Sequence, residues 1–181
     1  MERLETARLI LRPFTAADAG DLYEYAADPR VGPAAGWPAH KSLEESREII
    51  RTVFSEPWVY ALEDRGTGKV LGSAGFVNRH PDGIDPACPD DEIGYALNPA
   101  FWGRGLMPEA VEELLRFGFE ERGLSRIWCG HYEGNEKSKR VICKCGFSYR
   151  FTERSWVAAM GEYRVERHYL LRREDWRTQM K

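Results

Sequence analysis

The pattern of hydrophobic and polar residues predicts a chain in which β-strands alternate with amphipathic helices. Short apolar or alternating runs, which are typical of strands, occupy residues 7–14, 58–63, 70–77, 91–97, 125–131, 147–152 and 163–171. Apolar residues at helical spacing predict four helices, over residues 15–27, 42–54, 108–122 and 135–146. The clearest helical face is formed by Met107, Ala110, Val111, Leu114, Leu115 and Gly118.

This order of elements predicts a mixed α/β fold, in which about four helices flank a central, partly parallel sheet of about seven strands. The strands at 58–63 and 70–77 are joined by a short turn and form a hairpin. The helix at 108–122 connects the strands on either side of it as a crossover, which makes those two strands parallel. Because no linker or internal repeat divides the chain, we expect residues 1–181 to form a single domain.

Composition narrows the classes of function. The formal net charge is −3, with both signs interspersed, so there is no general electrostatic case for binding nucleic acid. No apolar run reaches the length of a signal-peptide core or a membrane span, and we expect a cytoplasmic protein with no membrane partner. The four cysteines fit that compartment as free thiols. Cys143-Lys-Cys145 lacks the usual two-residue spacer, so we expect no metal site.

A glycine-bearing turn between a strand and a helix is the most informative segment. It reads Trp102-Gly-Arg-Gly-Leu-Met107 and leads directly into the predicted helix at 108–122. Gly103 and Gly105 lack a Cβ, so the backbone there can approach a ligand closely. The start of a helix offers unpaired N–H groups, and its dipole favours negative charge. The turn therefore predicts a phosphate or diphosphate site, and a nucleotide-bearing small molecule as its ligand.

Three segments in this order resemble the GNAT acyltransferases, and most of all the branch that includes the ribosomal-protein N-terminal acetyltransferases RimJ and RimL. Glu92-Ile-Gly-Tyr-Ala-Leu97 is similar to the pantetheine-binding strand of the family. Trp102-Gly-Arg-Gly-Leu-Met107 is similar to its pyrophosphate loop. Asn135-Glu-Lys-Ser138 and Cys145-Gly-Phe147 resemble its second CoA-contacting helix and the strand that follows. The resemblance covers nearly the whole chain and implies acetyl-CoA as cosubstrate.

The resemblance also implies which residues bind acetyl-CoA. The strand that carries the pantetheine is expected to splay from its parallel neighbour, and its free backbone groups polarise the thioester carbonyl. The cofactor-binding set is Tyr95, Ala96, Leu97, Trp102, Gly103, Arg104, Gly105, Leu106, Met107, Asn135, Ser138 and Lys139. Met107 departs from the broad loop pattern of the family, which ends on a small residue. The tyrosine that many GNAT enzymes use as an acid is replaced by Ile142.

Two residues are the candidate catalytic groups. Glu92 shares one face of its strand with Gly94 and Ala96, which leaves room for a substrate beside a carboxylate that can act as general base. In the RimL-like branch a serine at the position of Ser138 is proposed to protonate the leaving thiolate. Tyr132 is an alternative acid and His131 an alternative base. We expect the amine to attack the thioester directly, without a covalent acetyl-enzyme.

The acceptor is left open between a protein N-terminus, which the RimJ/RimL resemblance implies, and a small amine such as a polyamine, amino acid or antibiotic. A non-catalytic CoA-binding module is the alternative of another class. Segments 31–41 and 152–163 are expected to line the acceptor cleft. A homodimer is expected only because many soluble enzymes form homodimers.

Overall fold

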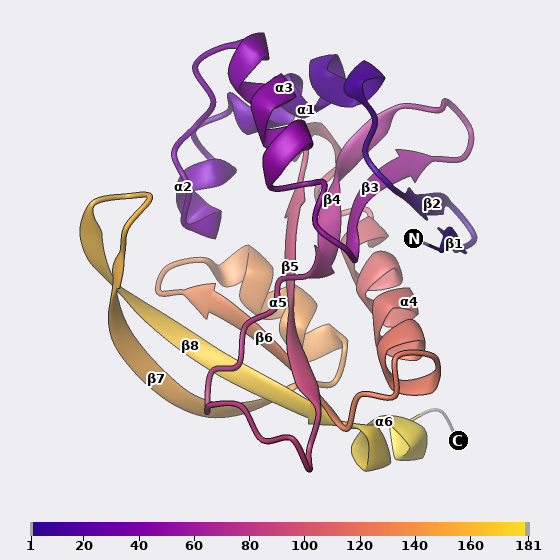
Figure 1. The fold of residues 1–181 in the computed structure, drawn as a ribbon, viewed down its shortest axis with the longest axis vertical. Coiled ribbons are helices and arrows are strands. Elements are labelled where there is room, and N and C mark those ends of the chain that lie inside the picture. Colours follow the sequence, from indigo (N-terminus) through magenta and orange to yellow (C-terminus); the bar gives the residue numbers. More distant parts are fainter. Residues whose placement is uncertain (1, 180–181) are drawn as a thin grey trace.

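The computed structural model describes residues 2–179, which form a twisted sheet with helices on both faces (Figure 1). The strands are β1 (Leu4–Glu5), β2 (Leu9–Arg12), β3 (Val59–Asp64), β4 (Val70–Phe76), β5 (Asp90–Leu97), β6 (Arg126–Tyr132), β7 (Ser148–Val157) and β8 (Glu162–Arg172). The helices are α1 (Ala19–Ala26), α2 (Gly32–Ala35), α3 (Leu43–Thr52), α4 (Leu106–Glu120), α5 (Glu136–Lys144) and α6 (Arg173–Gln179). Two 3₁₀ turns lie at Ala16–Asp18 and Pro99–Phe101.

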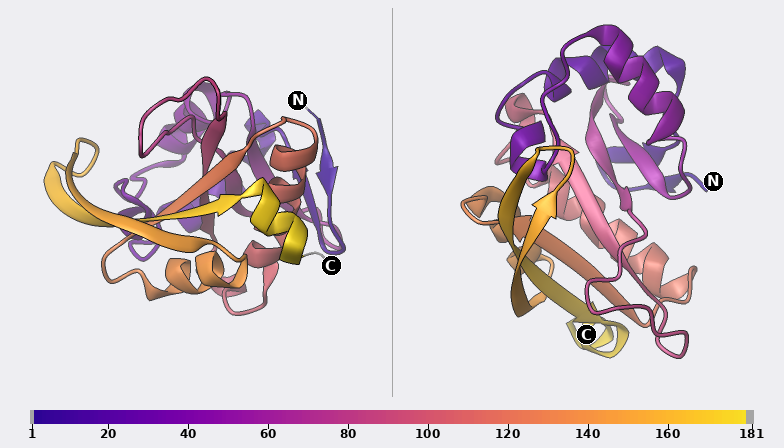
Figure 2. Two further views of the ribbon diagram at one scale, coloured as in Figure 1. Left: turned by 90° about the horizontal axis from the view of Figure 1, so that it is seen from below. Right: turned by 60° about the vertical axis from the view of Figure 1, so that its left-hand side comes forward.

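The eight strands of the described chain pair in the order β1-β2-β3-β4-β5-β6-β8-β7. β5 and β6 are parallel, and every other neighbouring pair is antiparallel. The parallel pair is the one that α4 connects, because a crossover through a helix returns the chain in the same direction. The outermost strands, β7 and β8, curl away from the rest of the sheet as a long hairpin (Figure 2).

Each face of the sheet has its own hydrophobic core. On one face, Ile93 and Leu97 of β5 pack with the apolar stripe of α4. Gly118 lets α4 come close to the sheet, since a Cβ there would lie 2.8 Å from the side chain of Ile127. On the opposite face, Ala96 packs with α1 and α3. Alternate residues of β5 therefore serve different layers, as the pleat requires.

The predicted fold class is confirmed as mixed α/β, with small differences in the elements. The sheet of the described chain has eight strands rather than about seven, because β1 adds a two-residue edge. Six α-helices occur in that part of the chain rather than about four, because α2 and α6 add short ones. α4 begins at Leu106, two residues before the predicted start, since Gly105 already takes the left-handed conformation that precedes the helix.

Two segments outside the predicted helices and strands have regular structure. α2 lies within segment 31–41, and it ends at Gly36, whose φ is 93°. β7 continues to Val157, so only residues 158–161 separate it from β8. Apolar and polar residues alternate only weakly along β7, because most of its residues are exposed at the edge of the sheet. The hydrophobic pattern therefore predicted that this strand ends at residue 152.

No helix in the part of the chain that the structure describes is both long enough and apolar enough to cross a membrane.

Candidate active site

β5 and β6 separate halfway along their length. Their parallel pairing covers Asp90 to Glu92 on β5 and Arg126 to Trp128 on β6, and then stops. Beyond Glu92, β5 continues to pair with β4 as far as Leu97. The carbonyl of Glu92 and the amide of Asn98 bond to the β4 side. By alternation, the backbone groups of Tyr95 and Leu97 face the gap toward β6.

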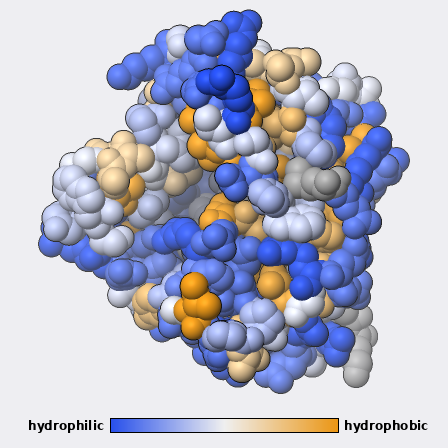
Figure 3. All heavy atoms as spheres, in the orientation of Figure 1, coloured by the Kyte–Doolittle hydropathy of each residue, from blue (hydrophilic) through white to orange (hydrophobic). Residues whose placement is uncertain are grey.

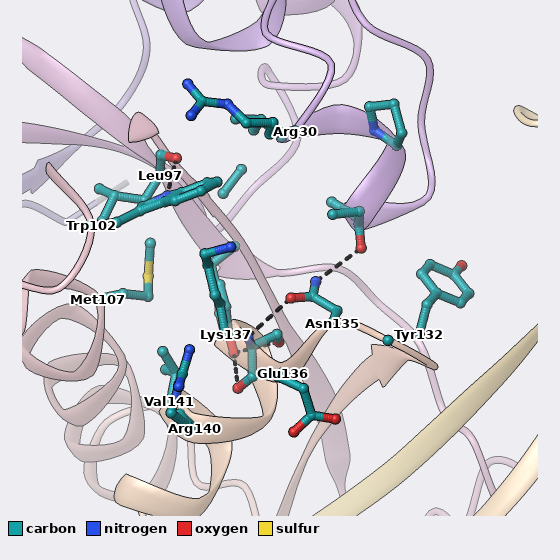
Figure 4. Close-up of a pocket in the computed structure, with 18 of the residues that line it drawn as sticks. Arg30, Leu97, Trp102, Met107, Tyr132, Asn135, Glu136, Lys137, Arg140 and Val141 are labelled. Atoms are coloured by element: carbon teal, nitrogen blue, oxygen red, sulfur yellow. Dashed lines mark hydrogen bonds between the residues drawn. The ribbon is translucent and has the colours of Figure 1, made fainter. Parts of the chain in front are cut away.

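A cleft of about 1210 Å³ fills this gap. The N-termini of α4 and α5 both open into it (Figure 4). Unpaired amides at these helix ends and the favourable end of each helix dipole make the cleft suited to negatively charged groups. Every backbone segment that the sequence assigned to acetyl-CoA, from Tyr95 through the glycine turn to Asn135, contributes residues to the walls of this cleft.

The glycine turn has the conformation that the sequence required. Gly103 and Gly105 both have φ of 75°, a left-handed conformation that other residues adopt only at a cost. A Cβ at Gly103 would meet nothing within 4 Å, so backbone conformation rather than crowding demands glycine there. Leu106 and Met107 follow as the first turn of α4 and are buried. The Met107 side chain lies at the floor of the cleft and within the main core (Figure 4).

Trp102 closes one side of the cleft. Its indole N–H donates to the carbonyl of Leu97 at 2.8 Å, which fixes the ring against the end of β5. The ammonium of Lys137 lies 4.6 Å from the ring centroid, and the Arg30 guanidinium lies 5.7 Å from it. These cations over an aromatic face hold positive charge at the mouth of the cleft.

Basic side chains line the cleft along one face of α5. Lys137, Arg140 and Lys144 contribute to its wall. Lys139, which the sequence assigned to the cofactor, points elsewhere and lies 3.5 Å from Glu136. The spacing of 137, 140 and 144 is that of one helical face, so periodicity alone offered this signal.

The side chain of Arg104 also lies away from the cleft. Its guanidinium donates to the carbonyl of Ala100 at 3.0 Å and stacks 5.0 Å from the centroid of Phe101. The backbone of Arg104 remains in the turn, where its carbonyl accepts a hydrogen bond from Arg8 at 2.9 Å. Arg104 is therefore not among the residues that line the cleft.

Asn135 joins the two sides of the site. Its side-chain oxygen accepts from the Ser138 amide at 3.1 Å and caps α5, while its Nδ2 donates to the carbonyl of Ala34 at 3.0 Å. Ala34 belongs to α2, and Arg164 of β8 donates to the carbonyl of Pro33 in the same helix. α2 is therefore held across the cleft. Part of segment 31–41, which was expected to line the acceptor site, contributes to the walls of this cleft.

Ser138 forms a pair of hydroxyl groups with Tyr95. The two oxygens are 2.8 Å apart, and the Tyr95 hydroxyl also lies 3.2 Å from the Ser138 carbonyl. Burial raises the pKa of the Tyr95 phenol well above its ordinary value, so the phenol keeps its proton at neutral pH. The sequence suggested Ser138 as an acid but assigned Tyr95 only through its backbone. The contact joins side chains 43 positions apart, which no local motif encodes.

A second, smaller hollow of about 320 Å³ lies on the other face of β5 and meets the cleft. The two hollows share Ala34, Ala35, Tyr95, Ala96, Tyr132, Asn135 and Ser138. Glycines on three strands, Gly75, Gly94 and Gly130, contribute to its lining. Figure 3 shows this face hollowed between the β7–β8 hairpin and the layer of helices above it. Segment 152–163, which was expected to line the acceptor site, contributes Tyr163 to the large cleft and no residue to the small hollow.

Glu92 lies in the small hollow, where the β5–β6 pairing ends. The residue is 4% exposed. Its Oε1 is 3.3 Å from Nη1 of Arg79, and its buried Oε2 has no hydrogen-bond partner. Burial raises the pKa of Glu92 to about 7, against the opposing effect of Arg79. A carboxyl group that changes protonation near neutral pH and keeps one oxygen free is equipped to accept a proton from a ligand.

Glu166 and Arg79 complete this cluster, and sequence reasoning missed both. Arg79 donates through Nη2 to the Glu166 Oε2 at 3.1 Å, and its Nη1 lies 3.3 Å from Oε1 of both glutamates. A Cβ at Gly130 would lie 2.7 Å from Glu166 and 3.3 Å from Glu92, so glycine lets the carboxylates converge over β6. Arg79 comes from an irregular segment, and Glu166 from a strand with alternating charges, so neither carried a local signal.

The two alternative candidates also border the site. His131 contributes to the small hollow, and its buried ring nitrogens contact the Tyr132 carbonyl at 2.9 Å and the Tyr169 hydroxyl at 3.2 Å. Tyr132 lines both hollows. Neither hollow is lined by a cysteine. Within residues 2–179 no cluster of histidine, cysteine and carboxylate side chains is suited to a metal ion.

Comparisons with known proteins agree with this geometry. Residues 8–148 match the model of the acetyltransferase (GNAT) domain. The chain is 30% identical to the uncharacterised N-acetyltransferase YoaA of Bacillus subtilis, over 87% of this chain and 89% of that protein. It is 25% identical to the [ribosomal protein uS5]-alanine N-acetyltransferase of Escherichia coli, over 96% of this chain and 92% of that protein.

A solved structure has the same fold. The microcin C7 self-immunity acetyltransferase MccE, in complex with acetyl-CoA and AMP, superposes with a TM-score of 0.77 at 19% identity, over 92% of this chain and 93% of that one. The matched domain model covers most of the chain, including the separated strands and the glycine turn. The chain therefore belongs to the GNAT family of N-acetyltransferases.

Proposed function

We propose that this protein transfers an acetyl group from acetyl-CoA to a primary amine by direct attack within a ternary complex. The large cleft binds acetyl-CoA: the amides of residues 103–107 hold the pyrophosphate, and the free edge of β5 pairs with the pantetheine amides. Lys137, Arg140 and Lys144 supply positive charge for the remaining phosphate. The small hollow binds the acceptor amine. The two ligands meet where the hollows share residues, beside Tyr95, Ala96 and Ser138.

The proposed reaction needs one base and one acid. Glu92 takes a proton from the acceptor ammonium, and the neutral nitrogen forms a bond to the thioester carbonyl carbon. A backbone N–H on the free edge of β5 stabilises the negative charge that develops on the carbonyl oxygen. The carbon–sulfur bond then breaks, and the thiolate receives a proton from the Ser138 hydroxyl, which lies 2.8 Å from the Tyr95 oxygen. The second proton of the attacking nitrogen passes to the Ser138 oxygen and restores its hydroxyl group. The products are an N-acetylated amine and free CoA.

The observation that carries this proposal is the free, buried Oε2 of Glu92. Leaving a buried carboxylate oxygen unpaired is costly, and such an atom indicates a ligand that donates a hydrogen bond. An ammonium or amine is such a donor. The raised pKa of about 7 adds the ability to remove the proton as well as to bind it.

The acceptor class follows from the size of the small hollow. A volume of about 320 Å³ lies at the low end of small-molecule sites and fits a compact group that carries the amine. A small amine satisfies this, and so does the first residue of a peptide. The E. coli relative named above acts on a ribosomal-protein alanine, so peptides that begin with alanine belong in any acceptor panel.

Release of free thiol from acetyl-CoA by the purified protein tests the proposal. The panel contains polyamines, aliphatic and aromatic monoamines, free amino acids and peptides with N-terminal alanine. Sustained thiol release that requires an amine supports the proposal, and mass spectrometry of the product identifies the acetylated nitrogen. Calorimetric binding of acetyl-CoA with no turnover over the whole panel would instead indicate a non-catalytic CoA-binding module.

A further inference from the structure

A second group of titratable side chains, which the proposed reaction does not use, begins at Glu166 in the wall of the small hollow. Glu166 and His168 lie on one face of β8, with side-chain exposures of 6% and 2%. Glu153, on β7 directly opposite Glu166 in the sheet register, is 52% exposed. The group therefore runs from the buried base toward solvent across two neighbouring strands.

The contacts along this group range from 3.3 to 3.9 Å, and the two that His168 makes are longer than a hydrogen bond. Nη1 of Arg79 lies 3.3 Å from Oε1 of both Glu92 and Glu166, and those two oxygens converge around the missing Cβ of Gly130. Nε2 of His168 lies 3.9 Å from Glu166 and 3.6 Å from Glu153. The ring stacks on Phe151 with centroids 4.7 Å apart, so its plane is fixed between the two carboxylates.

The buried Nε2 of His168 has no hydrogen-bond partner. An orphaned polar atom in a protein interior needs an explanation, and a nitrogen that alternates between two carboxylates provides one. The charged groups that face it are Glu166 on its own strand, Glu153 on β7 and Arg79 from the segment before β5. Burial lowers the pKa of His168, so the ring is neutral at rest and free to accept a proton.

We propose that Glu166, His168 and Glu153 form a relay by which the proton removed by Glu92 leaves the acceptor hollow for solvent. This inference rests on the proposed role of Glu92 as base. One proton enters at Glu92 in each turnover, passes to Glu166, then to Nε2 of His168, and leaves from the exposed carboxyl of Glu153. Each group returns to its starting charge, and Arg79 keeps its protons throughout.

The relay matters because the acceptor arrives charged. An amine at neutral pH brings its extra proton into a hollow that the bound cosubstrate closes on one side. Glu92 must lose that proton before the next turnover. A route through fixed side chains lets it do so without opening the hollow, as general acid–base groups placed in sequence allow.

Steady-state rates at low and high buffer concentration test the relay, using an acceptor on which the parent protein is active. The variants are Glu166→Gln, His168→Gln and Glu153→Gln, and Glu44→Gln is the matched control, since Glu44 lies on the exposed side of α3. In dilute buffer, we expect Glu166→Gln and His168→Gln to lower kcat about tenfold and Glu153→Gln about twofold. Concentrated MOPS, a tertiary amine that cannot be acetylated, should restore much of each loss by carrying the proton directly.

The outcomes separate the relay from a purely structural role. A relay predicts an unchanged KM for acetyl-CoA and buffer rescue in the variants alone. Variants with the parent's buffer dependence and pH profile overturn the relay while leaving the proposed reaction intact. A parent protein that acetylates no amine overturns both proposals. If His168→Gln fails a melting test for folding, Glu166→Gln and Glu153→Gln still decide the result.

Discussion

Glu92→Gln should abolish most activity and at the same time stabilise the protein above neutral pH. The change keeps the shape of the side chain and removes its charge, and Arg79 retains its pairing with Glu166. Burial raises the pKa of Glu92 from its ordinary 4.5 to about 7 in the folded protein. That difference corresponds to about 3 kcal/mol by which folding disfavours the ionised form.

The sign of the pH dependence follows from the raised pKa. The folded protein accommodates the neutral carboxyl of Glu92 better than the ionised one. The unfolding free energy is therefore highest below pH 4.5, and this stabilisation is lost as the pH rises through about 7. Glutamine has no charge to lose. The variant should therefore exceed the parent in unfolding free energy by up to about 3 kcal/mol at pH 8, or roughly 6–12 °C in Tm. The difference should shrink as the pH falls toward 5.

Activity should change in the opposite direction. With a pKa of about 7, Glu92 is roughly one-tenth ionised at pH 6, half at pH 7 and nine-tenths at pH 8. The parent's kcat should rise accordingly over this range, and Glu92→Gln should lower it by about 100-fold or more. Thiol release measures the rate, and thermal melts at pH 5, 6, 7 and 8 measure stability.

Glu44→Gln controls for the loss of a carboxylate, because Glu44 is 79% exposed and should leave both measurements unchanged. The reasoning on Glu92 is refuted by a Glu92→Gln variant that melts no higher than the parent at pH 8. Its catalytic role is refuted separately by a variant that retains the parent's rate and its rise with pH.

Three further predictions concern the cosubstrate. Ser138→Ala should lower kcat about tenfold to 100-fold with little change in the calorimetric Kd of acetyl-CoA, since the hydroxyl is needed only when the thiolate leaves; an unchanged kcat contradicts its role as acid. Gly105→Ala should weaken CoA binding about tenfold, because an alanine at φ of 75° costs roughly 1–2 kcal/mol and realigns the turn amides. If calorimetry finds the Kd of the parent protein, the turn does not bind CoA. The double variant Lys137→Ala/Arg140→Ala should weaken CoA binding and reduce its salt dependence. Lys139→Ala should change neither, because the Lys139 side chain faces Glu136. Equal effects of the two variants would show that Lys139 also contributes to CoA binding.

Elements with strong periodicity were predictable from sequence, and so was their order. The apolar stripe of α4 and the alternation of β5 fix which residues face which layer, and both are as predicted. α2 was not predicted, because its sequence, Gly32-Pro-Ala-Ala35, is bounded by glycine and has no apolar repeat. It forms because Trp37 packs on Gly32, where a Cβ would lie 2.5 Å from the indole, and because Asn135 and Arg164 bind its carbonyls.

The backbone of the large cleft was more predictable than the side chains of the small hollow. Helix N-termini and glycine turns are local features, so the segment 102–107 carried its own signal. The cluster of Glu92, Arg79 and Glu166 joins three separate parts of the chain, and it becomes visible only when the register of β6 and β8 is known. Glu92 could be named as a candidate because its own strand gave it small neighbours, whereas the residues it contacts depended on tertiary structure.

The early end of the β5–β6 ladder has a consequence for the stability of the whole molecule. Only three residue pairs join the two halves of the sheet there, and the unmatched edge of β5 is left without a neighbouring strand. A linear ligand that carries its own amides should complete that edge as a missing strand would. Occupancy should therefore tie the halves together, so that melting temperature climbs with ligand concentration and amides near residues 93–97 exchange with solvent more slowly.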